Sequence, residues 1–201
     1  MIITVSRQFG SGGREVGKRL ADALGLTYYD KELVTEISNH TDLNESYVSS
    51  VLESGGFRNY AFTFGRTMPF VSTTPAPVTD VLVAQQKIIK AIGEKGNCVI
   101  VGRSADVILK DFKPFRLFIY ADNDSKIARC RARAPEGEHY TDKQMIHRFK
   151  EIDSGRRKLH DLLGVHPWGD KAGYDLMINT TNVNIKAIIP ALAEYIKNST
   201  K

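Results

Sequence analysis

Residues 2–24 constrain the fold of this chain more than any other stretch of its sequence. Branched apolar residues at their start predict a short buried strand, and apolar residues at helical spacing towards their end predict a helix of about three turns. A glycine-rich turn with Gly10, Gly12 and Gly13 separates the two. This order of elements suits phosphate binding, because glycines let backbone N–H groups close around oxygens and a helix N-terminus adds unpaired donors and partial positive charge. An ordinary strand–turn–helix is the alternative.

The turn departs from the standard phosphate-binding loop, which has the pattern G-x-x-x-x-G-K-[ST]. When the pattern is placed directly after the strand, Arg7 takes the position of the first Gly and Gly12 keeps the second. Gly13 then stands where a Lys normally bridges the β- and γ-phosphates, and Arg14 stands where Ser or Thr normally holds Mg²⁺. We expect Arg14 to supply the missing charge, with Arg7 as the second candidate.

The length and charge of the chain suit one domain that binds small anions. Its 201 residues are enough for a single domain, residues 1–201, with a sizeable core. The net charge of +5 is mildly basic, which fits nucleotide substrates, and we expect no nucleic-acid and no membrane partner. The chain has no signal peptide and no run of about 18 apolar residues, and its Cys and His residues show no metal-ligand spacing. We therefore expect a cytoplasmic protein.

Strands alternate with helices along the rest of the chain, which predicts an α/β domain with a parallel sheet. Further strands are expected over residues 26–29, 98–101, 115–121 and 174–181. Helices are expected over 31–54 in two pieces broken near Thr41 and Asp42, and over 79–96, 123–134, from 141 onwards and over 184–197. The apolar run Cys98–Val101 is typical of a strand buried on both faces of a parallel sheet.

Polar residues follow two of these strands. Asp30 comes directly after the second strand, and Arg103 and Asp106 come shortly after the third. Open α/β sheets bind ligands at the carboxyl ends of their strands, so we expect Asp30 and Arg103 to face a second substrate opposite the phosphate loop. Asp30 could instead orient a metal-bound water, or cap the helix that follows it.

Residues 55–79 form a long segment without a regular hydrophobic pattern. Several Pro and aromatic residues are crowded into it, and loops of this length are usually functional or disordered. We expect an arm that either covers the substrate or packs on a second copy of the chain in a homo-oligomer. A loop folded over the protein's own core is the alternative.

Two predicted helices in the second half of the chain carry arginine-rich faces. Arg129 and Arg133 are four residues apart and share one face of the first helix, while Arg156 and Arg157 lie in the second. A short Pro/Gly turn joins the helices, so they could close over phosphate as a clamp, with the bidentate fork that only Arg offers. A solvated charged face is the alternative.

With these residues in view, the chain resembles the cytidylate kinase-like group of P-loop nucleoside monophosphate kinases over nearly its whole length, except residues 55–79. The resemblance rests on the variant phosphate loop Ser6–Glu15, on Tyr29–Asp30 where the monophosphate-binding helices begin, on Gly102–Arg103, on Arg129 and Arg133 before the lid, on Asp153 and Arg156 after it, and on the last strand and its exit, Tyr174–Thr181.

The resemblance implies a P-loop NTPase-type sheet of five parallel strands flanked by helices. It places a monophosphate-binding segment with the arm at about 31–79 and a short lid at about 134–141. It also implies transfer of a phosphoryl group from ATP, with Mg²⁺, to a nucleoside monophosphate such as CMP. The alternatives are a nucleotide-binding protein with little or no turnover, because the phosphate-loop Lys is absent, and a kinase of another small molecule.

The expected site residues form three groups. Nucleotide binding is expected at Gly10, Ser11, Gly12, Gly13, Arg14 and Glu15. The cations expected at the transferred phosphoryl group are Arg14, Arg129, Arg133 and Arg156. The residues expected at the acceptor are Asp30, Arg103, Asp106, Asp153 and Arg157. We expect Mg²⁺ to be held mainly by phosphate oxygens and water, with Asp30 as the candidate carboxylate.

Overall fold

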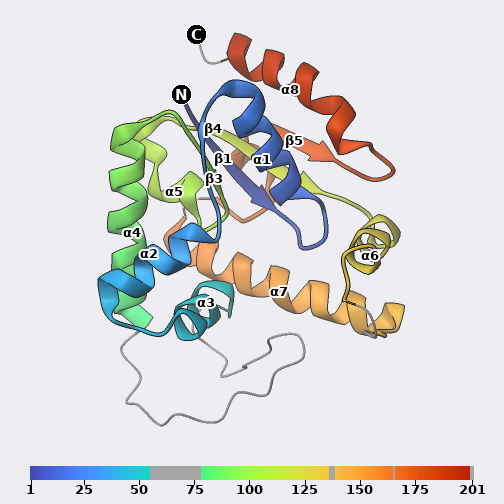
Figure 1. Cartoon of the computed structure of the whole chain (residues 1–201), viewed down its shortest axis with the longest axis horizontal. Coiled ribbons are helices and arrows are strands. Elements are labelled where there is room, and N and C mark those ends of the chain that lie inside the picture. The colour runs from blue at the N-terminus through green and yellow to red at the C-terminus, as the bar shows by residue number, and fades with distance from the viewer. Residues whose placement is uncertain (55–77, 136–138, 165, 200–201) are drawn as a thin grey trace.

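The computed structural model describes residues 1–54, 78–135, 139–164 and 166–199. A sheet of five parallel strands runs through the middle of the molecule (Figure 1). Its strands are β1 (Ile2–Arg7), β2 (Thr27–Tyr29), β3 (Cys98–Val101), β4 (Phe115–Tyr120) and β5 (Leu176–Asn179), in the order β2-β3-β1-β4-β5. The predicted five-stranded parallel sheet is therefore confirmed. The last strand is shorter at both ends than the predicted 174–181.

Helices cover both faces of the sheet. The helices are α1 (Gly13–Leu24), α2 (Glu32–Thr41), α3 (Glu45–Ser54), α4 (Val78–Lys95), α5 (Ala105–Ile108), α6 (Asn123–Arg131), α7 (Asp142–Leu163) and α8 (Ile185–Ser199), with 3₁₀ turns at Lys110–Phe112 and Lys171–Gly173. One core lies between the sheet and the pair α1 and α8. In the described ranges, no helix combines the length and the apolar character needed to cross a membrane.

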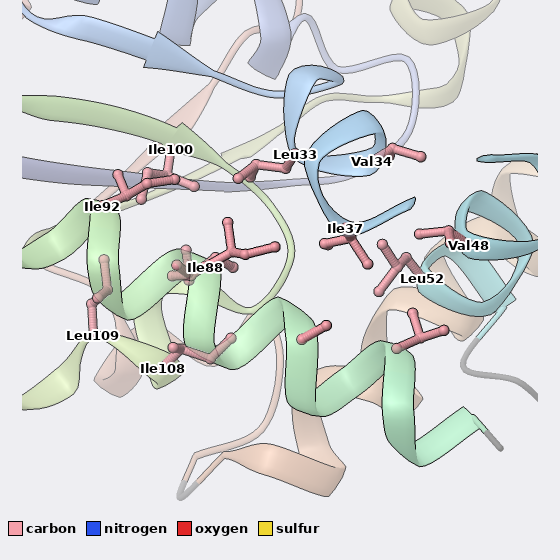
Figure 2. Close-up of a cluster of buried hydrophobic side chains, with 14 of the residues drawn as sticks. Leu33, Val34, Ile37, Val48, Leu52, Ile88, Ile92, Ile100, Ile108 and Leu109 are labelled. Atoms are coloured by element: carbon pink, nitrogen blue, oxygen red, sulfur yellow. The ribbon is translucent and has the colours of Figure 1, made fainter. Parts of the chain in front are cut away.

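The second core lies on the other face of the sheet and extends beneath α2 and α3. Figure 2 shows it, with Ile100 of β3 packed near Ile88 and Ile92 of α4, while α2 and α3 contribute Ile37 and Leu52. This packing fixes the helices that follow β2 against the part of the sheet where Asp30 and Arg103 emerge. It therefore positions one side of the candidate site.

Local signals in the sequence explain several helix ends. Gly25 follows the last residue of α1 with a φ of +66°, and its N–H donates to the carbonyl of Ala21. Glycine is the residue that most readily adopts this left-handed conformation, which ends many helices. Thr141 and Gln144 form the predicted capping box at the start of α7. Asp122 caps α6 by accepting a hydrogen bond from the N–H of Ser125 at 2.7 Å.

Other expectations differ from the structure or lie outside it. Helix α4 already begins at Val78, so Thr79 and Asp80 belong to its first turn. No pattern in the sequence predicted α5, which is only one turn long. Residues 55–77 and 136–138 lie outside the described residues, and with them most of the expected arm and of the expected lid.

Candidate functional site

The phosphate loop, residues 8–12, joins β1 to α1 at the carboxyl edge of the sheet (Figure 1). Gly10 and Gly12 have φ values of +74° and +82°, a left-handed conformation that residues with a Cβ rarely adopt. Within the described residues, no acceptor is found for three N–H groups at the start of α1, those of Gly13, Arg14 and Glu15. These donors, together with the positive end of the helix dipole, form a site for an anion.

Two side chains from distant parts of the chain anchor this loop. Thr180, directly after β5, donates a hydrogen bond from Oγ1 to the carbonyl of Ser11 at 2.7 Å. Asp153 of α7 accepts a hydrogen bond from the N–H of Phe9 at 2.8 Å through Oδ1. The loop is thus held from both sides by side chains of α7 and of the residue after β5.

Arg7 occupies the space beside the loop where the standard pattern would place a Lys. A Cβ added at Gly13 would lie 2.5 Å from the Cβ of Arg7, and one added at Gly102 would lie 1.5 Å from its Nη1. The Arg7 side chain therefore runs between two glycines, from the end of β1 towards the turn after β3. With Arg7 in this position there is no room for a side chain at residue 13. The two departures from the standard pattern, Arg at position 7 and Gly at position 13, therefore fit each other.

The Arg7 guanidinium is buried among other charges. Its Nη2 lies 3.8 Å from Oδ1 of Asp30, and only 11% of its side chain is exposed. Burial and repulsion by Arg156 lower the pKa of Arg7, Asp30 offsets part of this, and Arg103 and Arg14 lower the pKa further. Arg7 and Arg14 thus lie beside one carboxylate, and the charges of Arg103 and Arg156 are near enough to act on Arg7.

Asp30 faces these arginines rather than capping α2. The N-cap position of α2 is Lys31, and no side chain caps the helix there. Instead, Oδ2 of Asp30 lies 2.7 Å from Nε of Arg14, while its Oδ1 is buried and has no hydrogen-bond partner among the described residues. Of the three roles considered for Asp30, the cap is the one that the geometry does not support.

The turn after β3 has an unusual backbone. Gly102, Arg103 and Ser104 have φ values of +76°, +61° and +52°, which is uncommon for residues with a side chain. Gln85 of α4 holds the turn by donating from Nε2 to the carbonyl of Arg103 at 3.1 Å. Arg103, Arg7 and Arg156 line a cavity of about 30 Å³ here, which has room for only one or two water molecules.

Asp106 lies beneath this turn and contacts another protein side chain instead of open space. Its Oδ2 is 2.9 Å from Nε2 of His160 in α7, and both side chains are 1% exposed. Burial lowers the pKa of His160, but the hydrogen bond and charge of Asp106, with a smaller contribution from Asp161, outweigh it and raise the pKa above its ordinary value. The pair joins α7 to the turn that carries Arg103.

The arginines of the α6 region lie beside the phosphate loop. Arg129 donates hydrogen bonds to the carbonyl and to the hydroxyl of Thr180, the residue that also anchors the loop. Arg133, two residues past the end of α6, forms an ion pair with Glu15 of α1 at 2.8 Å. Glu15 therefore offers the loop its backbone N–H, while its carboxylate is already paired.

The arginines of α7 lie on different sides of the site. Arg156 donates from Nη1 to the carbonyl of Arg7 at 3.1 Å and lies 3.2 Å from Oδ1 of Asp153, whose pKa is raised by burial. Arg157 points instead over the ring of Trp168, 5.8 Å from its centroid, and lines a separate cavity of about 220 Å³. The structure thus brings Arg156 to the loop, whereas Arg157 lies over Trp168, which lines both cavities.

Three residues at the site were not among those selected from the sequence, namely Arg7 as a partner of the acceptor-side residues, Lys126 and Thr180. The sequence already indicates a role for Arg7, because Arg7 stands where the standard pattern has Gly and Gly13 stands where it has Lys. Lys126 lies on the same face of its helix as Arg129, but its burial against Gly10 depends on tertiary packing that the sequence does not show.

The five-stranded parallel sheet in the order β2-β3-β1-β4-β5, with a glycine-rich loop between β1 and α1, is the fold of P-loop kinases. The model of the cytidylate kinase-like family matches residues 2–182, and the chain belongs to this family. The resemblance noted from the sequence is thereby confirmed.

Solved structures show the same fold. An uncharacterized protein from Eubacterium ventriosum is 27% identical, with a TM-score of 0.70 and coverage of 98% of both chains. Shikimate kinase from Bacteroides thetaiotaomicron is 13% identical, with a TM-score of 0.59 and coverage of 98% of both chains. Shikimate kinase from Acinetobacter baumannii, in complex with shikimate, is 13% identical, with a TM-score of 0.53 and coverage of 99% of this chain and 94% of that one. No curated protein matches the sequence.

Proposed function

We propose that this chain transfers the γ-phosphoryl group of ATP to the phosphate of a nucleoside monophosphate, with CMP as the first candidate. The observation that carries the proposal is the gathering of Arg7, Arg14, Arg103 and Arg156 next to the phosphate loop. Two carboxylates, Asp30 and Asp153, contact this group. Clustered arginine side chains attract anionic groups and can bind phosphate oxygens in a bidentate way, so the site suits two phosphate-bearing ligands.

The chemistry needs positioning and charge more than acid–base groups. An oxygen of the acceptor phosphate forms a bond to the γ-phosphorus, and the bond from that phosphorus to the β–γ bridging oxygen breaks, so that ADP leaves with the electron pair. The attacking oxygen is already anionic and needs no strong base. The N–H groups at Gly13 to Glu15 would bind the donor phosphates, and Arg14, Arg129, Arg133 and Arg156 would neutralise the transferred group.

The acceptor would lie on the side of β2 and β3, against Arg103 and Arg7. The cavity of about 30 Å³ between them is too small for a nucleoside monophosphate, so side chains there must move on binding. Asp106 would act through the turn that carries Arg103, because its carboxylate is buried against His160. In this proposal Asp153 likewise acts by holding Phe9 and Arg156. Arg157, which lies over Trp168, would not contact the reacting phosphates.

The residues of the site are compatible with a Mg²⁺ ion near Asp30. Oδ1 of Asp30 is buried without a hydrogen-bond partner among the described residues, so it can accept a hydrogen bond from a metal-bound water. No Ser or Thr stands at the usual loop position, where the chain has Arg14. When bound, Mg²⁺ neutralises charge on the β- and γ-phosphate oxygens. Asp30 would orient its hydration shell, and Arg14 would fix the orientation of Asp30 through their 2.7 Å contact.

A second candidate function is nucleotide binding with little or no turnover. The observation that favours it is Gly13, which removes the loop Lys, together with the contact that draws Arg14 towards Asp30. In this case the arginines would bind phosphates without accelerating the transfer.

A screen of ATP consumption across nucleoside monophosphates separates the two. The protein is incubated with MgATP and CMP, dCMP, UMP, AMP, GMP or shikimate, and ADP formation is followed by a coupled assay. We expect at least one monophosphate, and not shikimate, to produce ADP at rates typical of an enzyme. ATP binding by calorimetry without ADP formation in any reaction would favour the second candidate. Turnover with shikimate alone would refute the proposed acceptor class.

A further inference from the structure

Lys126 of α6 lies directly against the phosphate loop. It is 6% exposed. A Cβ added at Gly10 would lie 3.1 Å from the Cβ of Lys126 and 3.3 Å from its Cγ, so the aliphatic stem of the lysine runs along the loop backbone. Gly10 therefore has a second role besides its left-handed turn. Its missing side chain leaves the space through which Lys126 passes.

The ammonium group of Lys126 has no direct partner in the described part of the chain. No hydrogen bond or ion pair joins it to another described residue, and although the residue as a whole is buried, its nitrogen still reaches solvent. Burial of the side chain lowers its pKa, while the charges of Asp153 and Asp122 oppose this. Asp153, the stronger of the two, also accepts the N–H of Phe9.

The arginines near the loop each contact another protein group. Arg7 runs between Gly13 and Gly102 towards the acceptor side, and Arg14 lies 2.7 Å from Asp30. Arg129 is bound to Thr180 and Arg133 to Glu15. These arginines would serve the transferred group, so the place of the usual loop lysine, at the β- and γ-phosphates, has no assigned cation, and Lys126 lies beside the loop with no partner in the described part of the chain.

We propose that Lys126 replaces the missing phosphate-loop lysine, reaching the β- and γ-phosphates of the donor nucleotide from α6 instead of from the loop. This inference rests on the proposed function, because it adds a cation for the donor nucleotide to the arginines of the proposed reaction. The same chemical group is delivered from a different element: in the standard pattern the lysine follows the second glycine, whereas here it approaches beside Gly10. The bound phosphates would then be the partner that the ammonium lacks among the described residues.

Lys126→Met tests the inference, because it removes the charge and keeps a flexible stem of similar length. ATP affinity is measured by calorimetry and kcat with the best acceptor from the screen. We expect the Kd for ATP to rise at least tenfold and kcat to fall on the order of 100-fold. Lys126→Arg, which keeps the charge, should lose clearly less. The matched control is Lys143→Met in the exposed first turn of α7, which changes net charge equally and should leave both values unchanged.

The midpoint of thermal unfolding, measured without ligand and with ATP, tests the role of Lys126 independently of the kinetics. Loss of a charge without a direct partner should leave the midpoint of Lys126→Met unchanged or raise it, whereas ATP should stabilise this variant less than the parent. A folded Lys126→Met within threefold of the parent in ATP affinity and kcat would overturn the inference and leave the proposed function standing. Equal losses in Lys126→Met and Lys126→Arg would also overturn it, because packing rather than charge would then matter. A parent that binds no ATP would refute both proposals.

Discussion

A single methyl group added at residue 13 should destabilise this protein, although Gly→Ala at a helical position ordinarily stabilises. Gly13 is the first residue of α1 and is not among the residues with positive φ, so Ala fits its backbone and would by itself contribute about 0.5–1 kcal/mol. The added Cβ, however, would lie 2.5 Å from the Cβ and 2.8 Å from the Cγ of Arg7. Such overpacking costs about 1–3 kcal/mol. We therefore expect Gly13→Ala to lower the free energy of unfolding by about 1 kcal/mol, since the difference between these two effects spans about 0–2.5 kcal/mol.

Arg7→Gly provides the matched background, because it removes both Arg7 carbons that the new methyl group would meet. In that background Gly13→Ala should be neutral or stabilising, so the double-mutant cycle should show a coupling of about 1–3 kcal/mol. The assay is urea unfolding followed by the fluorescence of Trp168, the single tryptophan, which is buried against Phe118. A coupling below about 0.5 kcal/mol would refute the claim that Arg7 is the reason why residue 13 must be Gly.

Three further predictions concern the site. Arg103→Ala should raise the KM for the monophosphate at least tenfold with a smaller effect on ATP, as steady-state kinetics would show; if only the ATP constant changed, the two binding sites would be reversed. Arg14→Ala should lower kcat by about 10³-fold and Arg14→Lys should recover part of it, whereas a loss within about threefold would exclude Arg14 from the transition state. The raised pKa of His160 means that its pair with Asp106 stabilises the fold fully below about pH 6.5 and that this contribution is lost as pH rises through the folded-state pKa. Urea unfolding from pH 6 to 9 should therefore show a steeper decline for the parent than for His160→Asn, and parallel curves would contradict this.

Local patterns in the sequence were enough to predict the sheet. The apolar run Cys98–Val101 is buried along its whole length, as a central parallel strand requires, and the glycine turn after the first strand lies where a phosphate loop belongs. Capping residues such as Thr141 also predicted their helix start. Each of these features depends on residues that are close together in the chain.

The parts of the site that the sequence did not show depend on residues far apart in the chain. Asp106 and His160 are separated by 54 positions, and no periodicity links a carboxylate after one strand to the middle of a later helix. Arg103 and Ser104 have positive φ values, which these residue types rarely adopt, so the sequence did not predict the turn. The burial of Lys126 depends on how α6 packs on Gly10, which only the tertiary structure decides.

The account rests on phosphoryl transfer between two phosphate-bearing ligands, and product analysis by ³¹P NMR tests this most directly. Protein is mixed with MgATP and CMP, and in parallel with each other monophosphate of the screen, and the spectra are followed until they no longer change. We predict that ADP and CDP appear in equal amounts, with no inorganic phosphate beyond that of a protein-free control. Formation of ADP with inorganic phosphate but no diphosphate of any tested monophosphate would contradict the account.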